Sequence, residues 1–294
     1  MKNFILILSF IFLFILGDRI ISKCLITLSK YSSLPYAKIY SGRAKSEILI
    51  LGDSRAYHHL NDSDWASISR HKTFSLSITG SPMILQEVLL RDYVNLYGNP
   101  KTIVIELNAL ISPVDKVISL KYLGLLSDNF KQLMRIYYSK QLKICQTFNL
   151  FFLNTIDYLN LLHKIAIEYD QPKLVGEMTD NDLDNLINKE YSPYFQNTDY
   201  NVKSLERIIR DFGEDVKIIL IITPFQKNFL ENQFEKDDWF NKIESMIPKI
   251  IKIFDYSESV INNEYYFDDR HLNEKGVKKL LNNMNKDNFF QKLI

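Results

Sequence analysis

The N-terminus is the most apolar stretch of the chain, and residues 4–17 contain no charged side chain. A helix over that run would be about 21 Å long at 1.5 Å per residue, short of the ~30 Å hydrocarbon core of a bilayer. Extending the helix to Ile21, with the Arg19 side chain reaching back to the interface, brings it near the required length. We therefore expect residues 1–22 to form a single membrane-crossing anchor.

Two other interpretations of this stretch stay open. A charged start followed by an apolar run also fits a cleaved signal peptide, but the residues at 17–19 and 22–24 are poor cleavage sites. A buried core helix is the third interpretation, and it is weaker because the run is apolar on every face and lies at the terminus. With an anchor or a signal peptide, Lys2 stays inside and the rest of the chain is exported. The predicted location of the body is therefore extracytoplasmic.

The rest of the chain alternates short apolar runs with longer amphipathic ones. The runs that predict buried strands are Ile48–Leu51, Phe74–Ile78, Thr102–Leu107 and Val216–Thr223. The stretches with helical spacing are 84–97, 202–212, 239–253 and 273–283. Strands that alternate with helices form a parallel sheet with helices on both faces. The pattern predicts a three-layer α/β/α sandwich.

Residues 115–201 do not follow this alternation. The stretch is rich in Leu, Tyr and Phe and is mostly helical in pattern. We expect it to be an insertion over the sheet, as a lid or a partner-docking surface. The predicted organisation is an anchor at 1–22 and one α/β domain at 40–294 that contains this insertion.

Charge and composition limit the classes of partner. The chain has 36 basic and 35 acidic residues, a formal net charge of +1, so it has no overall field that attracts nucleic acid. The two cysteines and five histidines show no metal-ligand spacing. We expect a small-molecule or neutral-polymer substrate, no nucleic acid partner, and no metal or organic cofactor.

The first strand ends in Gly52-Asp53-Ser54. A serine at the carboxyl end of a buried parallel strand lies where ligands bind in open α/β sheets. The glycine permits a sharp turn, and a helix that follows would point its N–H groups at the reacting centre. Ser54 is our candidate nucleophile, although a serine in a loop or at a helix cap has the same local sequence.

A candidate base lies near the C-terminus, where Asp268 precedes His271 by three residues. In that arrangement the aspartate accepts the imidazole Nδ1–H, and Nε2 is left to take the serine proton. The alternative is an ordinary surface histidine beside a helix that Asp269 or Asn273 caps.

Two further residues follow predicted strands. Gly80 is placed to offer a backbone N–H to a developing oxyanion, and Asn108 to offer its side-chain amide from the same sheet edge. Taken alone, Gly80 fits an ordinary turn glycine better, and Asn108 fits a strand-end cap better.

Serine, glycine, asparagine and histidine therefore occur in this order at the ends of predicted elements. The set resembles the SGNH (GDSL-like) hydrolase superfamily, which is named for these four residue types. Ser54 matches the first block, Gly80 the second, Asn108 the third, and Asp268 with His271 the fourth. The resemblance implies a flavodoxin-like sheet, a catalytic Ser54, His271 and Asp268, and an oxyanion hole made of Ser54, Gly80 and Asn108.

Two blocks depart from the usual pattern. The first has Arg55 where many members have leucine, and the third reads Glu106-Leu-Asn-Ala, without the usual glycine and aspartate. This variant is similar to the membrane-tethered, cell-envelope branch of the superfamily, in which some members transfer acyl groups to polysaccharides.

The resemblance implies ester hydrolysis or acyl transfer on cell-envelope carbohydrate, with an acyl ester or acylated carbohydrate as substrate. The alternative is a non-catalytic, membrane-tethered scaffold that docks a partner acyltransferase, for which the aromatic-rich stretch 115–201 would be the docking surface.

Overall fold

The computed structural model describes residues 2–165, 173–179, 182, 199–233 and 235–293. These residues form two compact units. The first contains residues 1–44, 91–96 and 115–170, and the second contains residues 45–90, 97–114 and 171–294. The expected insertion at 115–201 therefore contributes to both units, and its residues 166–172, 180–181 and 183–198 lie outside the described part.

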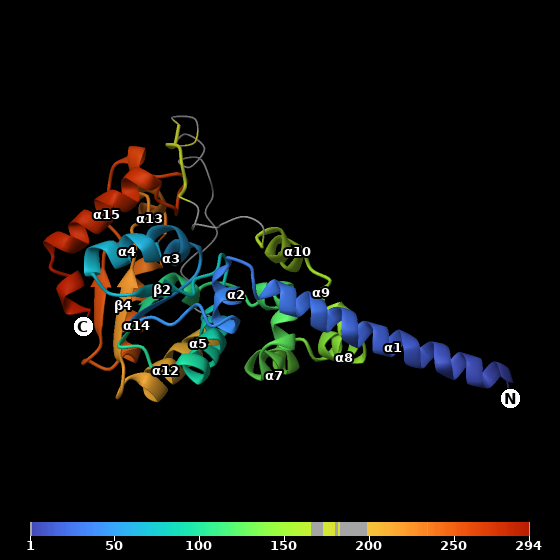
Figure 1. Ribbon diagram of the computed structural model, residues 1–294. Coiled ribbons are helices and arrows are strands. Elements are labelled where there is room, and N and C mark those ends of the chain that lie inside the picture. The colour runs from blue at the N-terminus through green and yellow to red at the C-terminus, as the bar shows by residue number, and fades with distance from the viewer. Residues whose placement is uncertain (1, 166–172, 180–181, 183–198, 234, 294) are drawn as a thin grey trace. The chain divides into compact units, whose positions relative to one another are not determined.

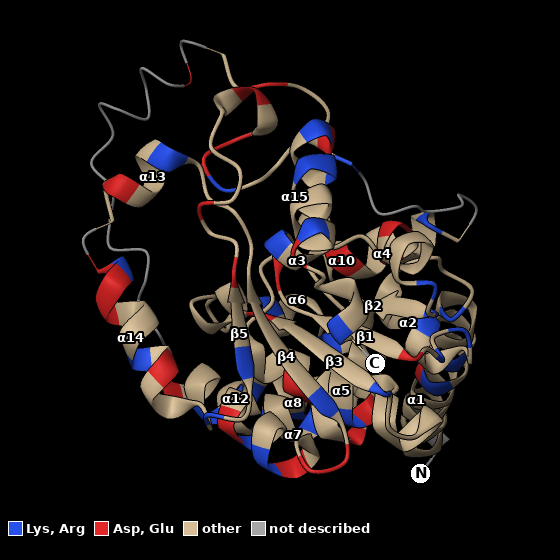
Figure 2. Cartoon of the chain, turned by 90° about the vertical axis from the view of Figure 1, so that its left-hand side faces the viewer, with Lys and Arg blue, Asp and Glu red and all other residues tan. Residues whose placement is uncertain are grey.

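The second unit contains a parallel sheet with the strand order β2-β1-β3-β4-β5. Its strands are β1 (Ile48–Leu51), β2 (Thr73–Ser75), β3 (Thr102–Glu106), β4 (Lys217–Ile222) and β5 (Lys252–Asp255). The three central strands are almost uncharged, as expected for strands that are covered on both faces (Figure 2). The order reverses direction between β1 and β3, so the crevice beyond their carboxyl ends is the expected ligand site.

Helices cover both faces of this sheet. On one face, side chains of β1, β3 and β4 pack against Trp65, Leu280 and Phe289 in a continuous apolar core. Figure 1 places α5 and α12 on the opposite side of the sheet from α4 and α15. The helices of this unit are α3 (Ser54–His59), α4 (Asp62–Ser69), α5 (Met83–Tyr97, shared with the first unit), η1 (Leu107–Leu110), α12 (Asp199–Phe212), α13 (Lys227–Glu231), α14 (Lys236–Met246), η3 (Asn263–Tyr265), α15 (Glu274–Lys286) and η4 (Phe290–Lys292).

The predicted fold class, a three-layer α/β/α sandwich with a parallel sheet, is confirmed. One predicted element is wrong: the helix expected over 239–253 ends at Met246, and β5 follows it. Pro248 explains the difference, because proline disfavours helical backbone in the residue before it and removes an N–H from the helix.

The first unit is helical. Its elements are α1 (Lys2–Ser29), α2 (Pro35–Tyr40), α6 (Lys116–Ser119), η2 (Lys121–Leu125), α7 (Asp128–Tyr137), α8 (Ser139–Thr147), α9 (Leu150–Leu153) and α10 (Ile156–His163). Within the described residues, α1 is the helix that is long and apolar enough to cross a membrane, and its N-terminal half is exposed. Its C-terminal half packs against α9 and α10. Residues 2–22 are therefore part of a longer helix that belongs to a helical unit.

We expect Ile221→Ala in β4 to lower the free energy of unfolding of the α/β unit by about 2–5 kcal/mol, because it leaves a cavity in the core. Ile250→Ala removes the same atoms from a side chain that is 89% exposed, and should change stability by less than about 0.5 kcal/mol. Both tryptophans, Trp65 and Trp239, lie in this unit, so urea unfolding followed by tryptophan fluorescence reports on it. Equal losses in the two variants would contradict this description of the core.

Candidate active site

The turn from β1 into α3 depends on Gly52. This residue has φ +154°, and a Cβ atom there would lie 2.5 Å from the Ala56 Cβ and 3.0 Å from the Glu106 Cβ. A side chain at this position would be strained, would clash with Ala56 and would crowd Glu106. The tight turn places Ser54 in the first turn of α3, at the carboxyl end of a central strand.

Ser54, His271 and Asp268 form a continuous hydrogen-bonded chain. The Ser54 Oγ lies 2.9 Å from the His271 Nε2, and the His271 Nδ1 lies 2.9 Å from each Asp268 carboxylate oxygen. The structure thus brings together three side chains from the two ends of the α/β unit. This is the geometry in which a histidine can take a proton from a serine while a carboxylate holds its tautomer.

Asp268 and His271 occupy a tight loop. An antiparallel bridge joins Tyr266 to Leu272, and the N–H groups of Arg270 and His271 each donate to the Asp268 Oδ1 over 2.8 Å. Burial by itself raises the pKa of Asp268, but the hydrogen bonds from the His271 ring and from these N–H groups outweigh it and lower the pKa to about 2. The carboxylate is therefore ionised at neutral pH.

The Asn108 side chain points at Asp53, the residue before Ser54. Its side-chain amide donates to the Asp53 Oδ2, which also accepts a hydrogen bond from the Ser112 hydroxyl over 3.0 Å. The other Asp53 oxygen caps α3 by accepting from the Arg55 N–H. Asp53 thus ties the loop after β3 to the start of α3. An amide nitrogen has two N–H groups, so an oxyanion contact by Asn108 would be made alongside the bond to Asp53.

Gly80 lies in an exposed turn after β2 with φ +69°. The Ile78 N–H donates to the Gly52 carbonyl over 3.3 Å, so the segment that leads to Gly80 runs beside the end of β1. The structure therefore brings Gly80 and Asn108 to the same sheet edge as the serine.

Arg55 and Glu106 form a buried ion pair beneath the serine. Both side chains are fully buried, and the Arg55 Nε lies 3.4 Å from the Glu106 Oε1. The guanidinium also donates to the carbonyls of Thr223 and Pro224 and stacks on the Phe225 ring, 3.3 Å from its centroid. Burial raises the pKa of Glu106, and the neighbouring Arg55 charge opposes this rise.

His59 lies one turn after Arg55 and holds the loop that carries His271. The Leu272 N–H donates to the His59 Nε2 over 2.9 Å, so the ring proton is on Nδ1, which lies 3.0 Å from the Thr223 hydroxyl. Burial and the nearby Arg55 charge lower the pKa of His59 well below its usual value. Arg55 also donates to the Arg270 carbonyl over 3.2 Å. Two side chains of α3 thus hold the peptide groups on either side of His271.

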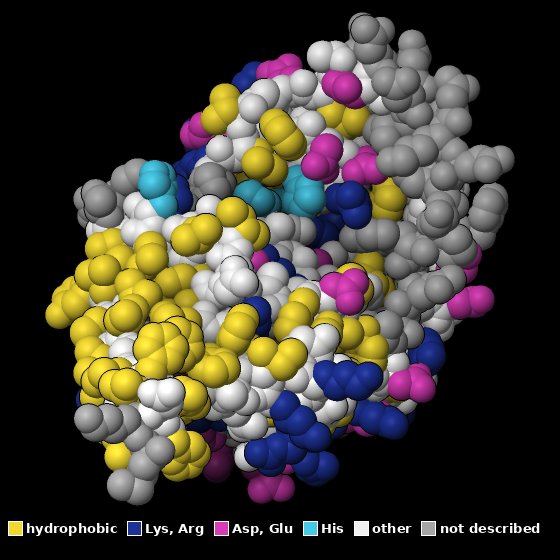
Figure 3. All heavy atoms as spheres, turned by 90° about the vertical axis from the view of Figure 1, so that its right-hand side faces the viewer, with side chains coloured by type: hydrophobic (Ala, Val, Ile, Leu, Met, Phe, Trp, Pro, Cys, Tyr) yellow, Lys and Arg dark blue, Asp and Glu magenta, His cyan; other side chains and the backbone are white. Residues whose placement is uncertain are grey.

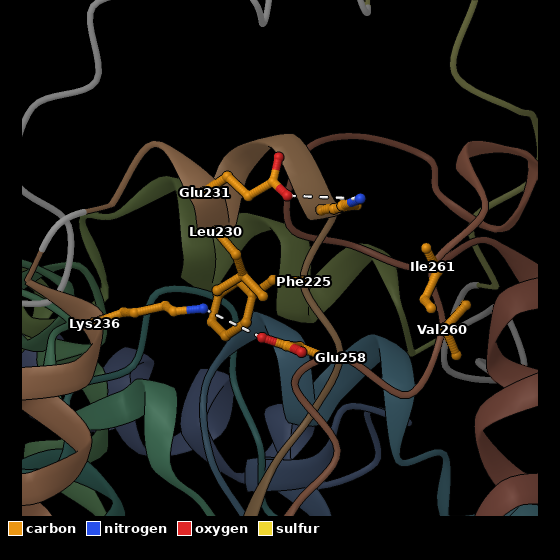
Figure 4. A pocket seen from close by; sticks show the side chains of 8 residues that line it. Phe225, Leu230, Glu231, Lys236, Glu258, Val260 and Ile261 are labelled. Carbon is orange, nitrogen blue, oxygen red and sulfur yellow. Dashed lines mark hydrogen bonds and ion pairs between the residues drawn. The ribbon is translucent and has the colours of Figure 1, made fainter.

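A separate cavity of about 290 Å³ opens beside this network (Figure 4). Phe225, Leu230, Val260 and Ile261 supply its apolar walls, and the ion pair between Lys236 and Glu258 closes one side. The Phe225 ring, on which the Arg55 guanidinium stacks, thus lines the cavity. Ser54, His271 and Asp268 do not line it.

Ser54, His271 and Asp268 carry sequence signals that predict a site, whereas Thr223 and Ser112 were not predicted. Thr223 directly follows β4, and the rule that the carboxyl ends of parallel strands converge could have found it. Ser112 has no such signal, because it lies beyond a 3-10 turn. In the part of the chain that the structure describes, no group of three or more His, Cys, Asp or Glu side chains is placed to hold a metal ion.

We expect Glu106→Gln to lower the free energy of unfolding by about 3–5 kcal/mol, because it leaves the Arg55 charge buried without a counter-charge. Glu47→Gln is the matched control: Glu47 pairs with Lys101 at the surface, where water screens the pair, so its loss should destabilise the protein much less than the loss of Glu106. Urea unfolding of both variants measures the difference. Similar small losses would show that the buried pair is not a structural requirement.

The low pKa of Asp268 predicts a pH-dependent contribution to stability. Its folded pKa of about 2 lies below the ordinary value of 3.8, so the ionised form stabilises the fold fully above about pH 4. This contribution is lost as the pH falls through about 2. The gap between the urea midpoints of the wild type and Asp268→Asn should therefore be constant near neutral pH and narrow below about pH 4. A gap that does not change with pH would contradict the bond between Asp268 and His271.

Comparisons with known proteins assign no family to this chain. No protein-family model matches the chain, and no curated protein sequence matches it. A solved structure described as "a putative platelet activating factor from Streptococcus pneumonia" is similar over 96% of this chain and 98% of that one, at 12% sequence identity and a TM-score of 0.42. A likeness at this level carries no information about the reaction.

Proposed function

We propose that the protein is a serine esterase or O-acyltransferase of the SGNH type that acts on cell-envelope carbohydrate. The observation that carries the proposal is the chain from Ser54 through His271 to Asp268, with 2.9 Å at each step. Serine and histidine side chains that contact each other at the carboxyl edge of a parallel sheet, with an ionised aspartate behind them, fit nucleophilic catalysis.

In the first half of the reaction, His271 Nε2 takes the hydroxyl proton of Ser54 while Oγ attacks the ester carbonyl carbon. The tetrahedral intermediate collapses, His271 returns the proton to the leaving alcohol, and the acyl group stays on Ser54. In the second half, His271 takes a proton from water or from a carbohydrate hydroxyl as its oxygen attacks the acyl carbon. The bond from that carbon to the Ser54 Oγ then breaks, and His271 returns the proton to Oγ. Water gives hydrolysis, and the sugar hydroxyl gives transfer.

The oxyanion would be held by N–H donors around the serine. The proposed set is the Ser54 N–H in the first turn of α3, the Gly80 N–H and the Asn108 amide. Donors that are fixed in place before the reaction contribute roughly 3–4 kcal/mol each to transition-state stabilisation. The bond from Asn108 to Asp53 supports this role because it fixes the amide beside the nucleophile.

The membrane location belongs to the same proposal. Helix α1 would anchor the protein as a single-pass, uncleaved segment, with the α/β unit on the extracytoplasmic side. Such an anchor holds the enzyme near envelope polymers, which favours an acylated carbohydrate over a soluble ester as substrate.

A scaffold that docks a membrane acyltransferase is the second candidate. The exposed apolar side chains of the helical unit, among them Ile136 and Ile156, favour it. A pure scaffold would not need Ser54, His271 and Asp268 in hydrogen-bond contact, which favours the enzyme.

We expect Ser54→Ala and His271→Ala each to lower kcat for hydrolysis of p-nitrophenyl acetate on the order of 10⁴-fold or more, because each removes a group that acts in the reaction. Ser67→Ala, which changes an exposed serine on α4, is the matched control and should leave kcat unchanged. Wild-type protein that is folded but no faster than Ser54→Ala would favour the scaffold.

A further inference from the structure

The membrane anchor proposed above has a polar break within the length that a bilayer requires. The uncharged run 4–17 covers about 21 Å, whereas the hydrocarbon core is ~30 Å thick, so Asp18 and Arg19 fall inside the span. Charged side chains at that depth are costly unless protein groups satisfy them.

The helical unit satisfies both residues. The Asp18 carboxylate is buried and accepts hydrogen bonds from the N–H groups of Asn149, over 2.8 Å, and Leu150, over 3.0 Å, where α9 begins. The Arg19 guanidinium donates to the carbonyls of Gln146 and Thr147 over 3.0 and 3.2 Å, at the end of α8. The segment 146–151, which we call the α8–α9 corner, therefore covers the polar break.

The outer surface of this corner is apolar. Leu150 is 36% exposed and Phe151 is 42% exposed. Phe148 packs edge-on against both Phe151 and Phe14, with ring centroids 6.0 and 5.5 Å apart. Phe14 lies one helical turn before Asp18, next to the exposed N-terminal half of α1. Through its contact with Phe14, the corner therefore lies beside the part of the anchor that lipid would surround. Figure 3 shows the molecule from the side on which α1 begins, and hydrophobic side chains gather on this face.

We propose that the α8–α9 corner is a second membrane-inserted element, which enters the bilayer beside α1 and brings Asp18 and Arg19 with it. The proposal rests on the membrane anchor and not on the catalytic role of Ser54. In this arrangement, the corner supplies apolar surface at the depth where the anchor is polar.

Lipid fits this surface better than a protein partner does. The contact between Phe14 and Phe148 makes this surface continuous with the anchor. A bilayer that surrounds Phe14 would therefore also contact the corner. Helix α8 leads into the corner with Lys140 and Lys143 exposed and contains no acidic residue, which suits lipid phosphates at the interface.

The test measures the depth of labels in the full-length chain, reconstituted in vesicles of phosphatidylcholine and phosphatidylglycerol. Both cysteines are free, so Cys24→Ser with Cys145→Ala gives a background without thiols. Single cysteines at Leu13, Phe151 or Ile136 are labelled with the fluorophore NBD. Ile136 is the matched control: it is an apolar residue of the same unit, 72% exposed, on a helix that packs against α8 and η2. Leu150→Cys replaces Phe151→Cys if that variant does not fold.

We expect spin-labelled lipids to quench the label at 151 about as strongly as the label at 13, and aqueous iodide to quench only the label at 136. If the label at 13 is in lipid but iodide reaches 151 as it reaches 136, the anchor stands and the corner is a water-exposed surface that is left for a protein partner; the inference is then wrong. If iodide also reaches the label at 13, the anchor itself fails, and the inference with it.

Discussion

The site depends on helix α3, which carries Ser54 and also holds the segment that carries His271. Arg55 and His59 are four residues apart and therefore lie on the same face of this helix. The first donates to the Arg270 carbonyl and the second accepts from the Leu272 N–H, so the peptide groups on both sides of His271 are fixed by the helix that presents the serine. Helix α3 thereby fixes the position of His271 relative to Ser54, although the two residues are 217 positions apart in sequence.

This arrangement buries the positive charge of Arg55 in the core, and residues of the neighbouring strands contact it. Glu106, at the end of β3, supplies the opposite charge, and Thr223, at the end of β4, donates to Glu106 and lies within hydrogen-bond distance of both Arg55 and His59. Arg55 and Glu106 are therefore each the charged partner of the other in the core of the unit.

The fold class and the candidate catalytic residues could be predicted from sequence, because they leave local or periodic patterns along the chain. The alternation of apolar strands and amphipathic helices predicts the sandwich, and the spacing of Asp268 and His271 predicts their hydrogen bond. The contact between Ser54 and His271 was expected only because the order of the four residue types resembles that of the SGNH superfamily. The pairing of Arg55 with Glu106 and the role of His59 depend on which side chains meet in three dimensions, which no spacing reveals. Strand β5 was missed because the apolar residues around Pro248 also fit a helical period. The support of Asp18 and Arg19 by residues more than a hundred positions away was unpredictable for the same reason.

The central claim is that Ser54 is a nucleophile activated by His271. The most direct measurement is peptide mapping by mass spectrometry after the folded, full-length protein has reacted with a fluorophosphonate. We expect one phosphonyl group per chain, located on Ser54. We expect none when the protein is first unfolded in urea, because only the folded protein brings His271 to the serine. A folded protein that takes up no phosphonyl group, or takes it up on another residue, would contradict the claim.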